Sequence, residues 1–388
     1  MRVLSLDITG KVSLYDNALF DSLLDATAQG DEWIGLTPYR SLSNVPQRKR
    51  GLFCLIPERK AHAGGLLKRS LKAIECLLNY ISLLWMIRID RPDVLHLQWL
   101  PFMEVNAWEV PLLRWMRRLN PRMKLVLTIH NVYPHNMGEA RKERYRLRFR
   151  KASALIDAFI VHTRISKADV VREFGLSPSR VHVCCHGVFE PKGITLNAEH
   201  RKDGKLHVLQ FGGQSYYKGT DLLVDAVCGL DEERKKRIET HIVGGISQNF
   251  LDELKAKDKD EVIIWKAYFL SEEELHQEIN AADLIVLPYR AISQSGVLLL
   301  SIFFEKLIIC SDLPSFRETM QGEWGDSLDR DLFFRTEDVG DLRNLLVRYV
   351  DGEVSEMLLR ERILHLKHLY SWERAARATW DLYRSMQT

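Results

Sequence analysis

The feature that most constrains the fold of this chain is a regular alternation of short apolar runs with segments long enough to form a helix. Six such runs occur in the first half, at residues 3–6, 32–36, 94–99, 124–131, 158–163 and 181–187. The pattern then begins again with six more runs, HVLQFGG, THIVGG, VIIWKAY, LIVLPY, LIICSD and DLFFR. Nearly continuous apolar strands separated by helices are typical of a parallel sheet covered on both faces. The sequence therefore predicts an α/β chain with two doubly wound parallel sheets, one after the other.

A polar segment separates the two halves. Residues 190–205, EPKGITLNAEHRKDGK, carry Pro and Gly and show no periodicity. We therefore expect a first domain at 1–188, a linker at 189–205, a second domain at 206–369 and a final helix at 370–388. Because doubly wound sheets bind ligands outside the carboxyl ends of their strands, we expect the two domains to face each other across a cleft that holds the substrate.

Composition excludes several classes of protein. A chain that is 46% hydrophobic and 28% charged has the balance of a soluble globular protein. Its six cysteines form no CxxC pair and no metal-ligand spacing, so we expect reduced thiols, no metal site and a cytoplasmic protein. The N-terminus, MRVLSLDI, predicts a core strand rather than a signal peptide. The longest apolar stretch, residues 73–87, is interrupted by Glu75 and Asn79, and we expect it to be too short to cross a bilayer.

Two loops of the second half combine small residues with the start of a helix. In FGGQSYYKGTDLL, residues 211–223, Gly212 and Gly213 allow close approach of the backbone and Lys218 adds a positive charge. The loop ISQSGV, residues 292–297, leads into an apolar helix in the same way. Neither loop has the order of a Walker or GxGxxG motif. One such loop is more often an ordinary turn, but two in one domain predict a site for the two phosphates of a nucleotide diphosphate.

The chain resembles the family 4 glycosyltransferases over nearly its whole length. The segments that carry the resemblance are, in order, DVLHLQWLP, LTIHNVYPH, YYKGTDLL, AADLIVLPY, SQSGVLLLS, CSDLPSFRE and YSWERAARATWDLYRSM. The resemblance implies a GT-B fold, in which two Rossmann-like domains face each other across a cleft and the last helix packs back on the first domain. It also implies a nucleotide-sugar donor held mainly by the second domain, and retaining transfer without a bound metal or other cofactor.

The resemblance also implies roles for individual residues. His130 would face the reacting sugar and Lys218 would neutralise the donor diphosphate, so these two are the expected catalytic residues. Asn131 and His135 would lie on the acceptor side. The expected donor-binding residues come from the two loops and from the loop after the next strand: Gly212, Gly213, Lys218, Gln294, Ser295, Gly296, Val297 and Glu318.

The chain departs from the family at several of these positions. Typical members carry a Glu-x7-Glu pair around the second loop, whereas Ser293 and Ser301 stand there in this sequence, as in a branch with an SQSGV-type loop. The arginine that usually accompanies the lysine is also missing. If the helix continues to Glu305, this residue lies one turn beyond Ser301 and would approach the ribose in place of the missing acid. The alternative is a capping or surface role near the helix end.

Positive charge gathers in the first half of the chain. Between residues 48 and 72 there are eight basic residues and one acidic residue, and residues 141–151 form a second basic cluster. Apolar residues then recur at alternating steps of four and three, a helical stripe formed by Leu67, Leu71, Ile74, Leu78, Ile81 and Trp85. Such a face suits anionic lipid headgroups, and the alternative is a core helix beside a solvated loop. Because no nucleic-acid-binding motif accompanies the charge, we expect no nucleic acid partner.

These observations together predict an enzyme. We expect a hexosyltransferase that uses a UDP- or GDP-sugar and a glycan or lipid-linked acceptor in bacterial surface polysaccharide or exopolysaccharide biosynthesis. We expect it in the cytoplasm, peripheral on the inner face of the cell membrane. Two alternatives stay open. One is a degenerate protein that binds a nucleotide-sugar without transfer, as the missing carboxylates suggest. The other is a different enzyme of the same fold, such as a nucleotide-sugar epimerase or a phosphorylase.

Overall fold

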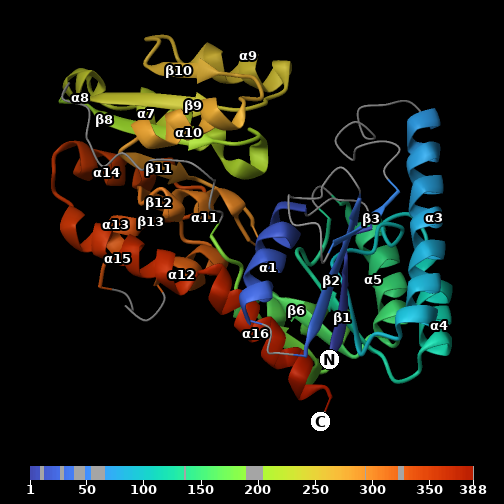
Figure 1. Ribbon diagram of the computed structural model, residues 1–388. Helices are drawn as coiled ribbons and strands as arrows, with labels where there is room; N and C mark the ends of the chain where they lie inside the picture. Colours follow the sequence, from blue (N-terminus) through green and yellow to red (C-terminus); the bar gives the residue numbers. More distant parts are fainter. Residues whose placement is uncertain are drawn as a thin grey trace. The chain divides into compact units, whose positions relative to one another are not determined.

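The computed structural model describes residues 1–8, 13–26, 30–38, 49–53, 66–134, 137–188, 204–292, 294–321 and 327–387 (Figure 1). The chain divides into two compact units. Unit 1 comprises Met1–Gly187 and Trp372–Thr388, and unit 2 comprises Val188–Ser371. Each unit has its own parallel sheet and its own hydrophobic core. Nearly all of the predicted linker, residues 189–205, lies outside the described residues.

The described part of unit 1 contains a sheet of seven parallel strands in the order β3-β2-β1-β4-β5-β6-β7. These strands are β1 (Arg2–Leu6), β2 (Glu32–Pro38), β3 (Lys49–Leu52), β4 (Val94–Leu97), β5 (Lys124–Thr128), β6 (Ala158–Val161) and β7 (Val181–Val183). The six predicted runs all form strands. The sequence analysis missed β3, because its four residues, KRGL, are mostly polar or flexible and lie at the sheet edge.

Helices cover both faces of this sheet (Figure 1). On one side lie α3 (Leu66–Asp90), α4 (Glu109–Leu119) and α5 (Glu139–Ser153), with α4 packed between the other two. On the other side α1 (Ser13–Ala26) packs against α16 (Trp372–Ser385). The described part of unit 1 also contains α6 (Arg164–Phe174) and the short η2 (Pro178–Arg180). Burial of both faces explains why β4, β6 and most of β5 have no exposed position and read as continuous apolar runs.

The described part of unit 2 contains six parallel strands in the order β10-β9-β8-β11-β12-β13. The strands are β8 (Leu206–Phe211), β9 (Ile238–Val243), β10 (Ile263–Lys266), β11 (Leu284–Leu287), β12 (Leu307–Ser311) and β13 (Phe333–Phe334). All six correspond to predicted runs. The strand order reverses between β8 and β11, which pair with each other. Doubly wound sheets bind their ligands at such a reversal, so the carboxyl ends of β8 and β11 mark the expected ligand edge.

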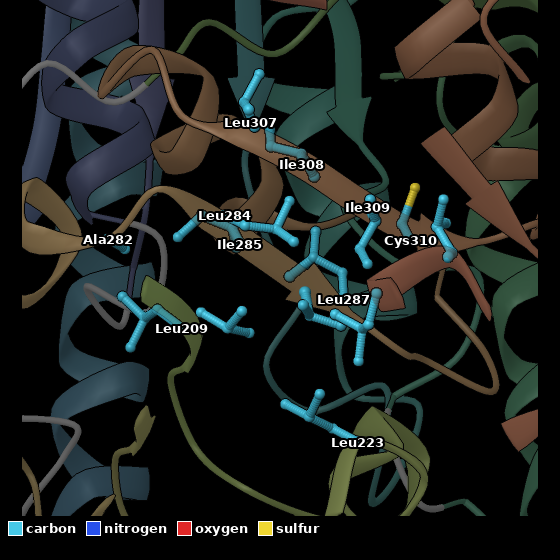
Figure 2. Close-up of a cluster of buried hydrophobic side chains, with 14 of the residues drawn as sticks. Leu209, Leu223, Ala282, Leu284, Ile285, Leu287, Leu307, Ile308, Ile309 and Cys310 are labelled. Carbon is cyan, nitrogen blue, oxygen red and sulfur yellow. The ribbon is translucent and has the colours of Figure 1, made fainter. Parts of the chain in front are cut away.

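The helices of unit 2 connect these strands across both faces of the sheet. They are η3 (Tyr216–Lys218), α7 (Thr220–Cys228), α8 (Glu232–Arg237), α9 (Gln248–Lys257), α10 (Glu272–Ala281), α11 (Gly296–Phe303), α12 (Pro314–Gln321), α13 (Asp329–Leu332), α14 (Val339–Val350) and α15 (Glu356–Leu369). Figure 2 shows the centre of the core, where side chains of β8, β11 and β12 meet those of the helices. Successive residues of β11 and β12 point to opposite faces and all are buried. The fold of each unit is therefore the predicted doubly wound, Rossmann-like α/β sheet.

The two segments of unit 1 meet where Gly187 lies against Trp372. A Cβ atom added to Gly187 would lie 2.3 Å from Cδ2 of the Trp372 indole, so only glycine fits at this position. The indole is buried, and its ring centroid lies 5.3 Å from that of Tyr15 and 5.1 Å from that of His186. This contact holds the start of α16 against α1 and the end of the segment after β7.

Replacing Gly187 with alanine should lower the free energy of unfolding by about 1–3 kcal/mol, because the added methyl group overpacks the indole of Trp372. Trp372→Leu should also destabilise the protein, but it makes room for the methyl group. The double variant should therefore lose less than the sum of the two single losses. Urea unfolding followed by circular dichroism measures all three variants, and strictly additive losses would argue against this contact.

Candidate active site

The carboxyl end of β8 is a glycine turn that touches the turn after β9. Gly212 and Gly244 have φ values of +97° and +126°, a conformation that glycine adopts without strain. A Cβ atom on Gly244 would lie 2.1 Å from the carbonyl oxygen of Gly212. The backbone N–H of Gln214 donates to the carbonyl of Gly245 at 2.8 Å. The two turns thus present backbone rather than bulky side chains at this edge, as phosphate-binding turns do.

Three buried polar side chains beneath this turn were missed by the sequence analysis. Gln210 Nε2 donates to the carbonyl oxygen of Lys218 at 3.1 Å, and Gln214 Nε2 donates to that of Val243 at 3.0 Å. The hydroxyl of Thr220 donates to Oε1 of Gln214 at 2.8 Å. These bonds fix the turn, η3 and the start of α7 as one piece. The sequence did contain a clue to these residues. Amide side chains that stand within an apolar strand, turn and helix are expected to be buried, and a buried amide needs a hydrogen-bond partner.

Lys218, at the end of η3, is the cation of this site. It is 8% exposed, and its Nζ would lie 3.0 Å from a Cβ atom added to Gly212. The same Nζ lies over the ring of Tyr289, 5.4 Å from the centroid. Burial lowers the pKa of Lys218 to about 8. Within the part of the chain that the structure describes, no carboxylate forms an ion pair with this ammonium group, which is therefore available to an anion.

The second predicted loop lies beside the first. Ser295 is the N-cap of α11, and its hydroxyl oxygen accepts a hydrogen bond from the backbone N–H of Leu298 at 3.1 Å. Cγ2 of Val297 would lie 3.4 Å from a Cβ atom on Gly212. The structure therefore brings the N-terminal turn of α11, Gly212 and Lys218 together across the β8–β11 reversal. Gln294 is half-buried in this loop, Gly296 is exposed at the first position of α11, and Ser293 lies outside the described residues.

Arg290 follows β11 and has a structural role. Its guanidinium group donates to both carboxylate oxygens of Asp221, at 2.8 and 2.7 Å, and to the carbonyl of Tyr216 at 2.6 Å. It also lies 3.8 Å over the ring of Tyr216. Arg290 thereby ties η3 and α7 to the end of β11 and supports the position of Lys218.

Two carboxylates lie elsewhere than the sequence analysis expected. Glu318 lies within α12 rather than in a loop. Helix α11 ends at Phe303, so the condition under which Glu305 would extend the helical face of Ser301 is not met. Glu305 has a φ of +56°, and its Oε1 accepts a hydrogen bond from Nζ of Lys367 at 2.7 Å. The alternative role at the helix end is the one that the structure supports.

In unit 1, three histidines follow three neighbouring strands. His130 comes after β5, His162 directly follows β6, and His186 follows β7. The ring centroids of His130 and His162 are 5.2 Å apart, and those of His162 and His186 are 5.3 Å apart. Tyr15 of α1, which the sequence analysis missed, packs on all three at 4.8–5.2 Å. We call these four residues the histidine cluster.

Hydrogen bonds determine which nitrogens of the histidine cluster carry protons. Burial lowers the pKa of His162 to about 4, so its ring is neutral at physiological pH. His162 Nδ1 lies 3.0 Å from the carbonyl oxygen of Cys184, which can only accept, so Nδ1 carries the proton. Its Nε2 then accepts a hydrogen bond from Nδ1 of His130 at 3.3 Å. Neutral His130 therefore carries its proton on Nδ1 and its lone pair on Nε2.

The other predicted residues of unit 1 have different positions. Asn131 follows His130 and is half-buried, and His135 lies outside the described residues. His96, a histidine within the apolar strand β4 for which no role was predicted above, is a core residue, since its two ring nitrogens contact the hydroxyls of Thr128 and Tyr383 at 2.7 and 2.5 Å. Among the residues that the structure describes, no group of three or more His, Cys, Asp or Glu side chains is placed to hold a metal ion.

Comparison with known proteins finds one family model that matches each half of the chain. Residues 52–189 match the family model described as Glycosyltransferase Family 4. Residues 205–351 match the family model described as Glycosyl transferases group 1. A relative from Xanthomonas campestris pv. campestris, named GDP-mannose:glycolipid 4-beta-D-mannosyltransferase, is 27% identical over 231 residues. This alignment covers 57% of the chain and 62% of the relative's own length.

Solved structures match the whole chain. The HepE protein of Anabaena, solved in complex with UDP and glucose, has a TM-score of 0.67 at 12% identity, covering 99% of this chain and 100% of that one. Sucrose-phosphate synthase from Thermosynechococcus elongatus has a TM-score of 0.65 at 15% identity, covering 100% of this chain and 98% of that one. The chain shares the fold of these neighbours over its whole length, so the prediction of the GT-B fold class is confirmed.

Lys218→Ala should weaken the binding of UDP or GDP, because a charge-assisted contact with phosphate contributes about 1.5–3 kcal/mol. Binding to the wild type should also take up a proton at about pH 9, since a bound anion returns the pKa of Lys218 from about 8 toward its ordinary value of 10.5. Calorimetry in buffers of different ionisation enthalpy measures both quantities. The variant should lose both the affinity and the proton uptake.

Lys306 provides a matched control for this measurement. Burial also lowers its pKa to about 8, and its Nζ donates to the carbonyl of Asn280 at 2.8 Å. Lys306 directly precedes β12, so it lies at the amino end of the strand, opposite the glycine turns. Lys306→Met should therefore keep the nucleotide affinity and the proton uptake. Equal nucleotide affinity in Lys218→Ala and the wild type would remove Lys218 from the site.

Proposed function

We propose that this chain, in which a family 4 glycosyltransferase domain precedes a group 1 glycosyl transferase domain, transfers a hexosyl group from a nucleotide-diphosphate sugar. The observation that carries the proposal is the position of Lys218. A buried ammonium group, without an ion pair among the described residues, lies between a glycine turn and a helix N-terminus at the strand-order reversal. Such an arrangement suits the diphosphate of a donor.

In the proposed reaction, unit 2 stabilises the leaving group. Breaking the bond between the sugar and the diphosphate leaves negative charge on the departing phosphate oxygen. The ammonium group of Lys218 and the backbone amides of the Gly212 turn and of the first turn of α11 would stabilise that charge. The low dielectric around a buried lysine strengthens this interaction. In this mechanism Lys218 stabilises the negative charge of the leaving group, and no metal ion is required for that role.

His130 would act on the acceptor or on the reacting sugar. Its Nε2 carries the lone pair when the ring is neutral, because Nδ1 donates to His162. An acceptor hydroxyl must lose a proton when its oxygen attacks the anomeric carbon, and Nε2 of a histidine can take that proton. We therefore assign His130 the role of proton acceptor or hydroxyl ligand, and His162 the role of a positioning residue.

The relatives favour GDP-mannose as the first donor to test. The Xanthomonas relative is named for GDP-mannose and a glycolipid acceptor, and the Anabaena HepE structure contains UDP and glucose. At 27% identity the sequence relative is closer than the structural neighbours. We propose a lipid-linked glycan of bacterial surface polysaccharide biosynthesis as the acceptor, with a UDP-hexose as the second donor candidate.

The stereochemical outcome separates two mechanisms. The family resemblance supports retention, with departure and attack on the same face of the sugar. The relative is named for a 4-β linkage, and forming a β linkage from an α-linked donor requires inversion, which needs a base such as His130. Proton NMR of the product, made from an α-linked donor, distinguishes the two by the anomeric configuration.

The decisive experiment incubates the protein with GDP-mannose, UDP-glucose and a lipid-linked glycan acceptor, with and without EDTA. We expect release of the nucleotide diphosphate that depends on both donor and acceptor and that EDTA leaves unchanged. Conversion to a second nucleotide-sugar would indicate an epimerase instead. Binding without turnover would favour the degenerate alternative, for which the serines in place of the usual Glu-x7-Glu pair are the specific observation.

His130→Ala should lower kcat by about 100-fold or more, the usual contribution of a general base, while GDP and UDP affinity stays unchanged. His162→Phe should also lower kcat and shift the acidic limb of the pH–rate profile, since Nδ1 of His130 then loses its acceptor. His162→Gln should restore part of the rate, because its amide oxygen can accept that hydrogen bond. Steady-state kinetics across pH measures these effects, with His182→Ala on β7 as the control.

If His130→Ala retains full kcat with the true acceptor, the assignment of His130 fails. If His162→Phe and His162→Gln behave alike, His162 contributes packing rather than a hydrogen bond.

A further inference from the structure

Helix α3 directs several polar side chains inward. Lys72 and Glu75 are buried and form an ion pair at 2.6 Å. Asn79 is fully buried, and its Oδ1 accepts from the backbone N–H of Phe53 at 2.8 Å while its Nδ2 donates to the carbonyl of Phe53 at 3.0 Å. The Lys72–Glu75 pair lies within the helix, and the bonds of Asn79 hold the inner face of α3 against Phe53, the residue that follows β3.

The opposite face of α3 is apolar and exposed. Six side chains at helical spacing are between 36% and 65% exposed: Leu71, Ile74, Leu78, Ile81, Trp85 and Ile89. They span 19 residues, and the 18 steps between the first and the last, at 1.5 Å each, give a length of about 27 Å. The alternative that this stripe belongs to the core is therefore wrong. An exposed apolar stripe of this length marks an interaction surface.

Helix α4, which packs beside α3, adds two exposed tryptophans. Trp108 directly precedes α4 and Trp115 lies seven residues later, and each is more than half exposed. Trp108 packs on Phe102, which in turn packs on Tyr80 of α3, with ring centroids about 6 Å apart in both pairs. Exposed tryptophans next to an apolar stripe are typical of surfaces that lie at a membrane–water interface.

The same layer of helices concentrates the positive charge of the chain. Residues 66–153 contain 17 basic and 7 acidic residues, so this segment carries +10, whereas the whole chain carries +3. On α5 the exposed basic residues include Arg141, Arg144 and Lys151. The remaining residues of the chain are therefore net negative. A surface that is both positive and rich in exposed apolar side chains complements a bilayer with anionic headgroups.

We propose that the layer formed by α3, α4 and α5 is a docking surface for an anionic lipid bilayer. The apolar stripe of α3 and the two tryptophans enter the interfacial region, and the basic residues of α5 contact the headgroups. Nucleic acid offers no environment for the apolar stripe. This docking does not depend on the proposed transfer reaction.

By length and composition alone, the part of α3 from Ser70 to Asp90 could also cross a membrane, which the sequence analysis did not expect. The bonds of its inner face argue for a helix that lies on the bilayer instead. Asn79 could not keep its hydrogen bonds to the backbone of Phe53 if α3 left unit 1 to span the lipid, and the buried pair of Lys72 and Glu75 would then lie in the hydrocarbon. The docked helix therefore stays part of the folded unit.

Vesicle flotation tests the apolar part of the surface. The full chain should float with phosphatidylcholine vesicles that contain phosphatidylglycerol. Ile81→Ser combined with Trp85→Ser should weaken this binding by about tenfold or more, because two exposed apolar anchors are lost. The matched control, Met357→Ser with Leu364→Ser, removes exposed apolar side chains from α15 of unit 2 and should float like the wild type.

The charge part of the surface has its own variant. The basic residues at the start of α3 do not suit this test, because Lys72 is buried and paired and the side chains of Lys68 and Arg69 lie outside the described part. The charge variant therefore uses exposed positions on α5. Reversing Arg141, Arg144 and Lys151 to Glu should reduce binding to anionic vesicles at low salt. Raising the salt should have the same effect on the wild type, because screening limits the field to about 8 Å at physiological ionic strength.

Three results would overturn the proposal. The first is a wild-type protein that ignores anionic vesicles, and the second is an Ile81→Ser/Trp85→Ser variant that binds them as well as the wild type. The third is a dimer in sedimentation velocity that the same variant dissociates, without vesicle binding, because the stripe would then be covered by a second copy. Nucleotide affinity, measured in parallel, should stay unchanged in all variants and separates this test from that of the transfer function.

Discussion

Burial of both faces of each parallel sheet is the constraint on which the rest of the structure depends. Helices on both sides remove water from the strands, so strand residues must be apolar or fully hydrogen-bonded. Polar chemistry is then confined to the carboxyl ends of the strands, where loops lead into helices. The histidine cluster of unit 1 and the glycine turns of unit 2 both occupy such edges.

The sequence allowed prediction of features that depend on neighbouring residues. The continuous apolar runs predicted every strand except β3, whose residues, KRGL, lack the apolar pattern that burial imposes on central strands. The glycine turn, Lys218 and the N-cap Ser295 were predicted because strand, loop and helix follow each other directly. The partners of Gln214 and the position of Tyr15 could not be predicted, because they depend on which distant segments meet.

The position of a residue around the helix axis, its helical phase, explains two differences between the sequence analysis and the structure. Glu75 and Asn79 look like interruptions of an apolar segment, yet with Lys72 they form a second stripe, at steps of three and four, that faces the sheet. Leu71, Ile74 and Leu78, each one position before a member of this stripe, face outward for the same geometric reason. In the other case, Glu305 follows the end of α11 and adopts a left-handed conformation, so the phase of that helix no longer applies to it.

At the proposed donor site, burial of Lys218 opposes folding stability. Burial lowers its pKa from 10.5 to about 8, so between these values the unfolded chain binds more protons than the folded one. The free energy of unfolding should therefore rise with pH across this window, and below it the charged lysine destabilises the fold throughout. An anion bound at the glycine turn offsets this cost, because it restores a partner to the ammonium group. The same charge that disfavours the empty site then stabilises the complex, so ligand binding and the stability of unit 2 are coupled through one side chain.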